Sequence, residues 1–459
     1  MEVSIILAAG QGKRMKSDKA KVLHEVLGRP MLFYVLNACK ESNIEKNLVV
    51  IGNKKEQIKE AFKEGDSLKF IAQPMGNGKP YGTGFAVSCC LGEIDDNDNI
   101  IILNGDTPLI NSQTIDKFLS YHRSKDNDLT VLTADLCDPT NYGRIIRDGD
   151  ANVKKIVEHK DATEKEKLVR EINSGIFAFK GKALKYAISK IDANNAQHEL
   201  YLTDTLKILV EENKKVGTYK LKDTREILGV NSRADLAYVE ENLRDIVNYE
   251  YMINGVTLIN PKQTYIEYGA CIEADVTIYP NSYIDKGSHI ETGAQIKDSK
   301  IINSHIGKNV KITTSLIEES SIGDGTTVGP NAHLRPNSKV GKNCKVGNFV
   351  EIKNSNIGDG TKMSHLAYIG DADIGANVNI GCGVIFVNYD GKKKYRTMVG
   401  DHAFIGSNSN LVAPIEVEEY GYIAAGSTIT KKVFKGQLSL ERNEQKNIDG
   451  WVSKKGFDK

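Results

Sequence analysis

The sequence predicts an α/β part followed by an all-β part, and three observations support this fold class. Short β-rich apolar runs alternate with amphipathic helical stretches over residues 1–228, which is typical of a mostly parallel sheet covered by helices. One capped helix is predicted over 229–250 as a linker. Over 251–459 aliphatic residues recur at a step of six, which is the signature of a parallel β-helix.

The first part places two loops at the edge of its predicted sheet. Its helices are expected at 30–41 and 113–125, where apolar residues recur at three-to-four spacing. Its buried strands are expected at 3–7, 47–52, 99–106, 128–134 and 174–180. Ligands of such sheets bind outside the carboxyl ends of the strands. The loop "LAAGQGKRM" and the tripeptide "NGD" both follow strands, so both are candidates for a ligand site.

The linker helix and the β-helix are recognised by their spacing of apolar residues. The helix starts at Ser232, and its apolar stripe consists of Ala234, Leu236, Val239, Leu243 and Ile246. The six-residue step of the β-helix runs through Ile266, Ile272, Ile278, Ile284, Ile290, Ile296 and Ile302, then Ile322, Val328, Leu334, Val340, Val346 and Ile352, then Val399, Ile405, Leu411, Val417, Ile423 and Ile429. Each aliphatic should point inward, and the step is typical of the left-handed triangular prism.

One interruption of the repeat marks a possible binding loop. Phe386 and Val399 are thirteen residues apart, so residues 387–398 should protrude from the prism. A tolerated insertion is one explanation. Asn388, Tyr389 and a basic cluster favour the other, which is a loop that binds a ligand.

Composition excludes several classes of protein. The 459 residues include 61 basic and 60 acidic side chains, a balance that argues against nucleic-acid or membrane-surface partners. The seven cysteines are scattered without metal-ligand spacing, which suits reduced thiols in the cytoplasm. The apolar start lacks a basic n-region, so no signal peptide is expected. No apolar run of about 18 residues is present to span a membrane.

The glycine loop after the first strand fits neither common phosphate-binding template. A dinucleotide fingerprint needs glycine where Met15 stands, and a P-loop needs Ser or Thr where Arg14 follows Lys13. Its backbone amides can nevertheless surround a nucleotide, with Arg14 and Lys21 supplying positive charge. A solvated basic turn is the alternative for this pair, but its place at a strand end favours phosphate binding.

Asp106 is a candidate magnesium ligand because it ends an apolar strand, a poor place for an uncompensated charge. Mg²⁺ held by one or two protein oxygens and by phosphates would compensate it. The alternative is a turn or N-cap aspartate before Pro108. Asn231 could be the second ligand, or it could cap the linker helix.

His365 is a candidate general base for acyl transfer to an amine, a role that depends on its neighbours Tyr368 and Asn379 and on the family that the motifs resemble. The amine must lose a proton as it attacks a thioester, and histidine, with an ordinary pKa of about 6.5, can accept it near neutral pH. Most of the other histidines, such as His122 and His289, are expected to be surface polar groups. No cysteine or serine lies in a nucleophile motif, so direct transfer is expected rather than an acyl-enzyme.

The motifs "LAAGQGKRM", "KVLH" and "NGDTPL" resemble the sugar-nucleotidyltransferase family. Together with "YGRI", "IVEHKDA", "EINSGI", "GVNSR", "HLRP", "GNFVEIKN", "HLAYIGDADIG", "NVNIG" and "NYDG", they resemble a bifunctional bacterial family up to about residue 436. Members of that family acetylate glucosamine-1-phosphate from acetyl-CoA. They then transfer UMP from UTP to N-acetylglucosamine-1-phosphate. The resemblance implies a Rossmann-like uridylyltransferase domain, a β-helix acetyltransferase domain, and a cyclic homotrimer acting on small molecules.

The resemblance also assigns roles to individual residues. UDP-N-acetylglucosamine would be bound by Leu7, Ala8, Ala9, Gly10, Lys21, Gln73, Gly82, Thr83, Gly143, Glu158, Asn173 and Asn231. Asp106 and Asn231 would bind Mg²⁺. In the β-helix His365 would be the base, and glucosamine-1-phosphate would be bound by Arg335, Lys353, Tyr368 and Asn379. Acetyl-CoA would be bound by Cys382, Asn388, Tyr389, Lys394, Ser407, Ala425 and Arg442.

Three departures from that family pattern are visible. Extra residues separate Gln73 from Gly82, Ala20 replaces a common proline, and "LERNEQ" replaces an arginine-x-proline around Arg442. Two other functions compete with the bifunctional one. An ADP-glucose-type nucleotidyltransferase would lack the histidine, tyrosine and asparagine cluster on the β-helix. A non-catalytic scaffold would lack Asp106, Lys21 or His365.

Overall fold

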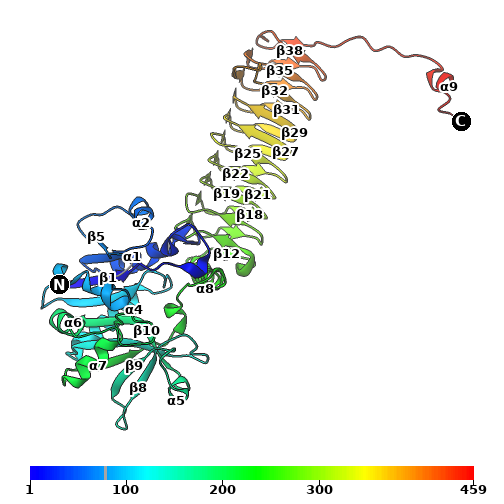
Figure 1. Ribbon diagram of the computed structural model, residues 1–459. Coiled ribbons are helices and arrows are strands. Elements are labelled where there is room, and N and C mark those ends of the chain that lie inside the picture. Colours follow the sequence, from blue (N-terminus) through cyan, green and yellow to red (C-terminus); the bar gives the residue numbers. More distant parts are fainter. Residues whose placement is uncertain (77–79, 459) are drawn as a thin grey trace. The chain divides into compact units, whose positions relative to one another are not determined.

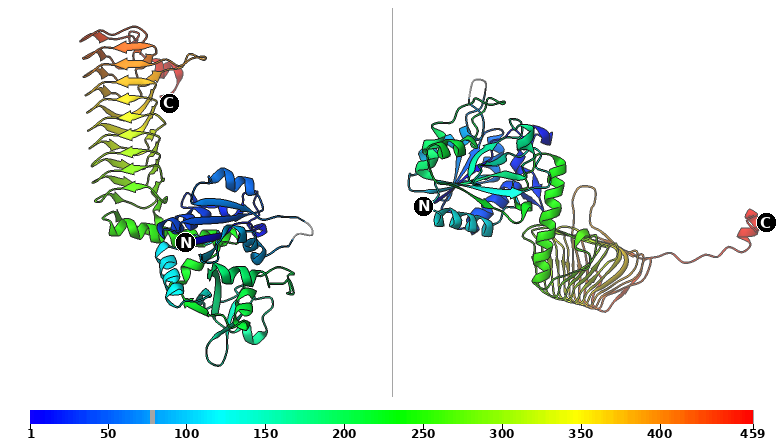
Figure 2. Two further views of the ribbon diagram at one scale, coloured as in Figure 1. Left: turned by 90° about the vertical axis from the view of Figure 1, so that its left-hand side faces the viewer. Right: turned by 90° about the horizontal axis from the view of Figure 1, so that it is seen from below.

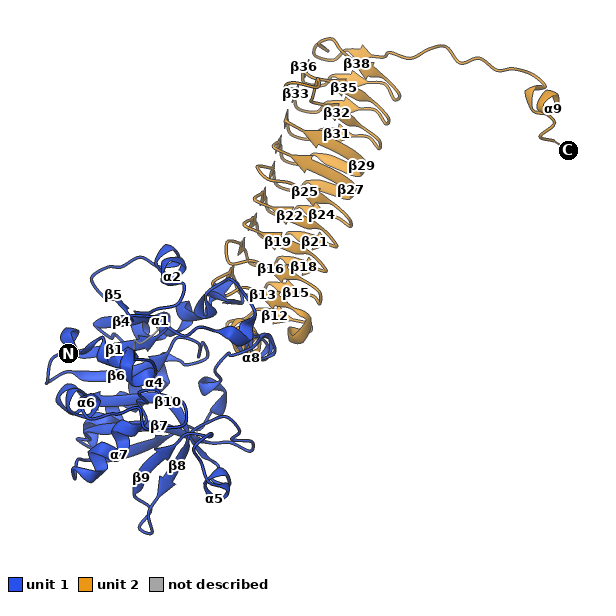
Figure 3. Ribbon diagram, viewed as in Figure 1, with its two compact units in different colours: residues 1–243 blue, residues 244–459 orange. Residues whose placement is uncertain are grey.

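The computed structural model describes residues 1–76 and 80–458. The chain divides into two compact units, Met1–Leu243 and Arg244–Lys459 (Figure 3). The division falls within helix α8 (Arg233–Ile253), the helix predicted as a linker. The domain boundaries after residues 228 and 250 stay a prediction.

The first unit is built on a mostly parallel sheet, as predicted (Figure 1). The order of its strands is β11-β7-β10-β6-β1-β4-β5. Strand β10 runs antiparallel to both of its neighbours in this order, and the other pairs are parallel. Strands β8 (Arg144–Arg147) and β9 (Val153–Val157) form an antiparallel extension. The strands of the main order are β1 (Glu2–Leu7), β4 (Lys46–Ile51), β5 (Leu68–Ala72), β6 (Asn99–Asn104), β7 (Leu129–Asp135), β10 (Glu171–Lys180) and β11 (Val216–Lys220).

Both faces of this sheet are buried, which explains why its strands are nearly continuous apolar runs. Ile6 and Leu103 belong to one core with helices α1 (Met31–Glu41) and α4 (Ser112–Ser124). Ile5 and Ile102 belong to the opposite core with α3 (Thr83–Ser88), α6 (Gly181–Ile188) and α7 (Asp204–Glu211). Successive residues of a strand point to opposite faces, so one strand contributes to both cores.

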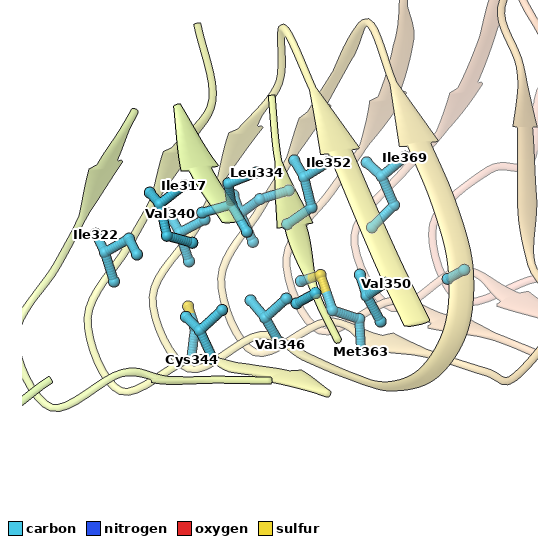
Figure 4. Close-up of a cluster of buried hydrophobic side chains, with 14 of the residues drawn as sticks. Ile317, Ile322, Leu334, Val340, Cys344, Val346, Val350, Ile352, Met363 and Ile369 are labelled. Carbon is cyan, nitrogen blue, oxygen red and sulfur yellow. The ribbon is translucent and has the colours of Figure 1, made fainter. Parts of the chain in front are cut away.

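The second unit is a parallel β-helix, as predicted, whose coils stack one on another (Figure 2). In-register pairs such as Ile278 with Ile296, and Ile296 with Ile312, place each inward aliphatic on its counterpart in the next coil. The ladder continues through the middle of the unit, where Val340, Val346, Ile352 and Met363 are buried (Figure 4).

The six-residue step is wrong in one stretch of this repeat. Ile302 is only half-buried, whereas Ile301 is fully buried and pairs with Ile284 and Ile317. The inward residues Ile296, Ile301 and Ile306 lie five residues apart because two faces here are one residue shorter. Ile272 is also only partly buried, at the side of the core.

Corners of the prism carry residues with left-handed backbone. Most are Asn, Asp or Gly, which adopt positive φ at low cost. The exceptions among the described residues include Thr314, Glu319, His402 and Tyr420. Two further exceptions lie in strands β27 (Lys345–Lys353) and β29 (Lys362–Gly370), where Phe349 has φ of 58° and Leu366 has φ of 34°. Both side chains are exposed. No helix among the described residues has the length and apolar character needed to cross a membrane.

Candidate functional site

The nucleotide-binding candidates meet at the carboxyl ends of β1 and β6. These parallel strands are in register, with Leu7 opposite Asn104. The Gly105 backbone N–H donates to the Leu7 carbonyl at 3.0 Å. The register therefore brings the glycine loop beside the "NGD" loop, at the edge where such sheets bind ligands.

The glycine loop lines a cavity of about 490 Å³. Gly12 has φ of 59°, and a Cβ there would lie 2.9 Å from Cβ of Lys21, so the loop folds tightly over that lysine. Met15 is buried beneath it, whereas Arg14 is exposed at the rim. The cavity is lined by Gly10, Gln11, Gly12, Lys13, Arg14, Lys21, Tyr81, Gln197 and Asn231. Tyr81 and Gln197 carry no motif, and only the fold places them here.

Backbone groups at the start of the loop are partly occupied by the sheet. The Ala8 N–H donates to the Val50 carbonyl at 2.9 Å, and the Ala9 carbonyl accepts from Asn53. Gly10 is exposed, and a Cβ on it would meet nothing within 4 Å. Of the four residues predicted at 7–10, Gly10 is thus the one with an open surface.

Lys21 lies between the two predicted metal ligands. Its ammonium donates to Oδ2 of Asp106 and, at 2.8 Å, to Oδ1 of Asn231. The side chains of Lys21 and Asp106 are only 14% and 21% exposed, so this ion pair is shielded from solvent. Two protein oxygens therefore converge on one cation position.

The N-cap alternative considered for Asp106 and Asn231 does not describe this geometry, although Asp106 does lie in a turn directly after β6. Ser232 caps helix α8, because its Oγ accepts from the Asp235 N–H while the Asp235 carboxylate accepts from the Ser232 N–H. Asn111 caps α4. The side chains of Asp106 and Asn231 instead point to Lys21.

Gly143, Glu158 and Asn173 form a second cluster, next to β8, β9 and β10. The Asn173 N–H donates to the Gly143 carbonyl at 2.9 Å, and a Cβ at Gly143 would lie 3.4 Å from Oε1 of Glu158. Burial raises the pKa of Glu158, whose carboxylate accepts from Thr203 Oγ1 at 3.3 Å. A half-buried carboxylate beside an amide suits the hydroxyl groups of a sugar.

The predicted base-binding residues lie on both sides of the 77–79 segment. The departure noted between Gln73 and Gly82 lies partly outside the described residues. Gln73 is buried after β5, and its N–H donates to the Ile51 carbonyl at 2.8 Å. At Gly82 φ is 113°, and a Cβ would lie 2.5 Å from the Leu200 carbonyl oxygen. The Thr83 hydroxyl accepts from the Leu202 N–H at 3.1 Å, so it fixes the backbone here.

In the β-helix, one corner column gathers His365 and several predicted acetyl-CoA residues. Register places Met363 beside Ile380, and Ile380 beside Ile405, which in turn pairs with Ile423. The residues two positions after these four form a column at the corner. They are His365, Cys382, Ser407 and Ala425, and all of them are exposed. Arg442 lies at the end of this column, where its guanidinium donates to the Ala425 carbonyl at 3.0 Å.

The next corner gathers the basic residues. Arg335 and Lys353 are adjacent in the β25 (His333–Leu334) to β27 register, and Arg335 pairs with Glu351 at 2.8 Å. The neighbouring Lys394 ammonium, together with burial, lowers the pKa of Lys353. The 387–398 loop therefore returns along the prism to Lys353, although the two residues were predicted for different ligands.

Asn388 anchors that loop. Its amide donates to Oδ2 of Asp371, whose Oδ1 accepts from Asn354 on the previous coil. Tyr389 is exposed, and its backbone pairs with that of Lys394 in an isolated antiparallel β-bridge across the loop. The loop thus leaves and re-enters the prism at the corner that carries Arg335 and Lys353.

These two corners are well separated on one chain. Leu366 and Asp371 have positive φ and mark successive corners. The five residue steps from Leu366 to Asp371 span about 17 Å, at about 3.3 Å per residue of strand. Tyr368 lies on the face between the corners, whereas Asn379 is in register with Lys362 on the face before His365. One chain therefore holds the predicted acetyl-transfer residues in separate groups.

Comparisons with known proteins match both units. Residues 3–251 match the nucleotidyl transferase family, and residues 319–354 match the bacterial transferase hexapeptide (six repeats) family. The "Bifunctional protein GlmU" of Acetivibrio thermocellus is 47% identical over 457 residues, which cover 99% of this chain and 98% of that protein. The protein of the same name from Clostridioides difficile is 47% identical over 98% of this chain and 97% of its own length. The chain belongs to the family of the bifunctional protein GlmU.

Proposed function

We propose that the chain makes UDP-N-acetylglucosamine in two steps. The second unit acetylates glucosamine-1-phosphate from acetyl-CoA, and the first unit transfers UMP from UTP to N-acetylglucosamine-1-phosphate, releasing pyrophosphate. The observation that carries this proposal is the position of Lys21 between Asp106 and Asn231 at the rim of the glycine-loop cavity. Anionic phosphates can be neutralised there while the cluster of Gly143, Glu158 and Asn173 holds the sugar.

Uridylyl transfer requires alignment and charge neutralisation more than covalent chemistry. A phosphate oxygen of the sugar attacks the α-phosphate of UTP, and pyrophosphate leaves. Lys21 and Arg14 would neutralise the phosphates, and the open edge at Gly10 would admit the nucleoside. Leu7, Ala8, Ala9, Gln73, Gly82 and Thr83 would complete the uridine site.

The residues present fit Mg²⁺. Oxygens of Asp106 and Asn231 converge on the position that the Lys21 ammonium takes in this structure, so Mg²⁺ would bind between them with that ammonium turned toward the phosphates. Among the described residues no group of three His, Cys, Asp or Glu side chains could hold a metal. Phosphates and water would therefore supply the remaining ligands, as is usual for Mg²⁺. When bound, the ion would neutralise part of the negative charge of the phosphates.

Acetyl transfer would use His365 as a general base. Its imidazole takes the proton that the sugar amine loses as nitrogen attacks the thioester carbonyl. Coenzyme A leaves as the thiol, and an amide remains. Arg335 and Lys353 would bind the sugar phosphate, and Tyr368 and Asn379 the sugar. Acetyl-CoA would lie along the column of Cys382, Ser407, Ala425 and Arg442, with Asn388, Tyr389 and Lys394 from the loop.

A direct assay tests this function. Purified protein is incubated with glucosamine-1-phosphate, acetyl-CoA, UTP and magnesium, and products are identified by mass spectrometry. UDP-N-acetylglucosamine should form, and omission of acetyl-CoA should prevent it unless N-acetylglucosamine-1-phosphate is supplied. A parallel reaction with ATP and glucose-1-phosphate tests the ADP-glucose alternative. Formation of ADP-glucose without UDP-N-acetylglucosamine would reject the proposal.

The separation of the two corners supports a homotrimer with acetyl-transfer sites between neighbouring chains. His365 and Asn388 lie at corners about 17 Å apart on one chain. A cyclic assembly can bring one corner of a chain against the other corner of its neighbour, and small-molecule sites are usually concave. The balanced charge and the seven free cysteines support an enzyme of the cytoplasm acting on small molecules.

Mixed assemblies test the trimer. His365→Ala and Asn388→Ala chains, each inactive alone in acetyl transfer, are co-expressed with different affinity tags and purified through both tags. Mixed trimers should recover part of the acetyltransferase activity, because some interfaces combine an intact His365 with an intact Asn388. Light scattering should give the mass of three chains. Absence of recovery in verified mixed trimers would place each site on one chain.

A further inference from the structure

His365 has a side-chain partner, Asn348, to which the sequence assigned no role, although it lies in the stretch "GNFVEIKN". Its Nδ1 lies 3.0 Å from Oδ1 of Asn348 on the preceding coil. The parallel register of β27 and β29 pairs these two residues directly. Cys382 takes the corresponding position on the coil after His365, so the imidazole lies in a column between an amide and a thiol.

The backbone is built to bring Asn348 and His365 together. A Cβ at Gly347 would clash with the Ser364 carbonyl oxygen, so glycine permits an unusually close approach of the two coils. Directly after each member of the pair, the chain turns through a left-handed residue, Phe349 or Leu366. Non-glycine residues rarely adopt such φ values, and strained positions of this kind concentrate at functional sites. Asn348 is half-buried whereas His365 is exposed.

The chemistry of this contact selects one imidazole tautomer. A carbonyl oxygen of an amide can only accept, so the contact requires a proton on Nδ1. The neutral imidazole then carries its lone pair on Nε2, since the hydrogen bond of one ring nitrogen decides the state of the other. No partner of Nε2 is seen among the described residues. The lone pair therefore lies on the nitrogen that is open to a substrate.

We propose that Asn348 is a positioning residue for acetyl transfer, which holds His365 in the Nδ1–H tautomer and directs Nε2 toward the amine. This inference rests on the proposed role of His365 as the base. After Nε2 has taken the amine proton, Nδ1–H still donates to Asn348, so the contact is kept through the reaction. Asn348 is neutral, and it orients the base without adding a charge.

The ionisable groups around the pair are few. Lys362 lies three residues before His365 and Tyr368 three residues after it, and their register partners are Lys345 and Glu351. The Cys382 thiol lies on the next coil. All of these remain in the variants below, so differences between pH profiles report on position 348.

Three variants test the proposal in the full-length protein. Asn348→Ala removes the acceptor, and kcat for acetyl transfer should fall about 10-fold to 100-fold, the range found when the partner that orients a metal-binding imidazole is removed. Asn348→Asp keeps an acceptor and adds a negative charge, which favours the imidazolium. It should recover activity at high pH and move the acid limb of the kcat/KM profile up by about one pH unit. Asn356→Ala, an asparagine on another face that bonds Asp373, should match the parent.

The outcomes separate this inference from the proposed function. Thermal unfolding and oligomer mass confirm that each variant is folded. If the parent does not acetylate, or if His365→Ala keeps full activity, the proposed function fails. If His365→Ala is inactive while Asn348→Ala is fully active, Asn348 has no positioning role. An acid limb that does not move in Asn348→Asp would equally overturn the inference.

Discussion

Replacing His365 by alanine should abolish acetylation of glucosamine-1-phosphate and leave uridylyl transfer intact. A positioned general base contributes about 10²-fold to 10⁴-fold to the rate, and alanine offers no proton acceptor. The residues proposed for uridylyl transfer all belong to Met1–Leu243, whereas His365 belongs to the other compact unit. Each reaction is measured separately, with N-acetylglucosamine-1-phosphate supplied for the uridylyl assay.

The reverse separation is expected for Lys21→Ala. Loss of the ammonium beside Asp106 and Asn231 removes one charge-stabilising donor, a change that costs about 10²-fold to 10³-fold in kcat in comparable sites. Acetylation should continue at the parental rate. Both substitutions have matched controls. The control for His365→Ala is His289→Ala, because His289 belongs to the same β-helix. The control for Lys21→Ala is Lys19→Ala, because Lys19 is near in sequence and pairs with Glu25 on the surface.

If the two reactions use separate sites, the results for these four variants are fixed. Both controls should retain both activities. If His365→Ala or Lys21→Ala removed both activities from a folded protein, the reactions would share a site, and the assignment to separate units would be wrong.

Removal of divalent metal should stop uridylyl transfer and spare acetyl transfer. Mg²⁺ stabilises transferred phosphoryl groups by several kcal/mol, which corresponds to a loss of about 100-fold or more without it. A histidine base needs no metal, so excess EDTA should leave acetylation unchanged. Both activities are assayed in the same EDTA-treated sample, and excess Mg²⁺ should restore the lost one.

Asp106→Asn links that metal dependence to this site. The variant keeps the shape of the side chain but removes its charge, so a higher Mg²⁺ concentration should be needed for half-maximal uridylyl transfer. An unchanged Mg²⁺ requirement in Asp106→Asn would remove Asp106 from the metal site. Equal loss of both activities under EDTA would overturn the separation of the two chemistries.

Much of the fold could be predicted because hydrophobic periodicity is a local property. The apolar runs of the first unit predicted β1, β4, β6, β7 and β10 to within a few residues, and the six-residue step predicted the β-helix. The exception near Ile302 has a physical reason: a face can lose one residue where a corner tightens, and the inward position then moves to Ile301. A fixed step in the sequence cannot reveal such a shift.

Only some of the site residues could be predicted from the sequence. The motifs drew attention to Lys21, Asp106, Asn231 and His365. They also contain Asn348, but its role could not be predicted because its contact with His365 depends on the register of two coils. Tyr81 and Gln197 were missed for the same reason, although both line the cavity of the glycine loop. Their positions depend on which loops the sheet brings together.

The sequence by itself determined the strand and helix periodicities, the repeat, and which residue types were available for chemistry. Only the tertiary structure decided which of them meet. Lys21 reaches Asp106 across 85 residues and Asn231 across 210, because parallel strands bring their carboxyl ends to one edge. Lys394 returns to Lys353, and His365 is separated from Asn388, because coils and corners set their positions. Such contacts depend on register and on long-range approach of the backbone, which local sequence patterns do not encode.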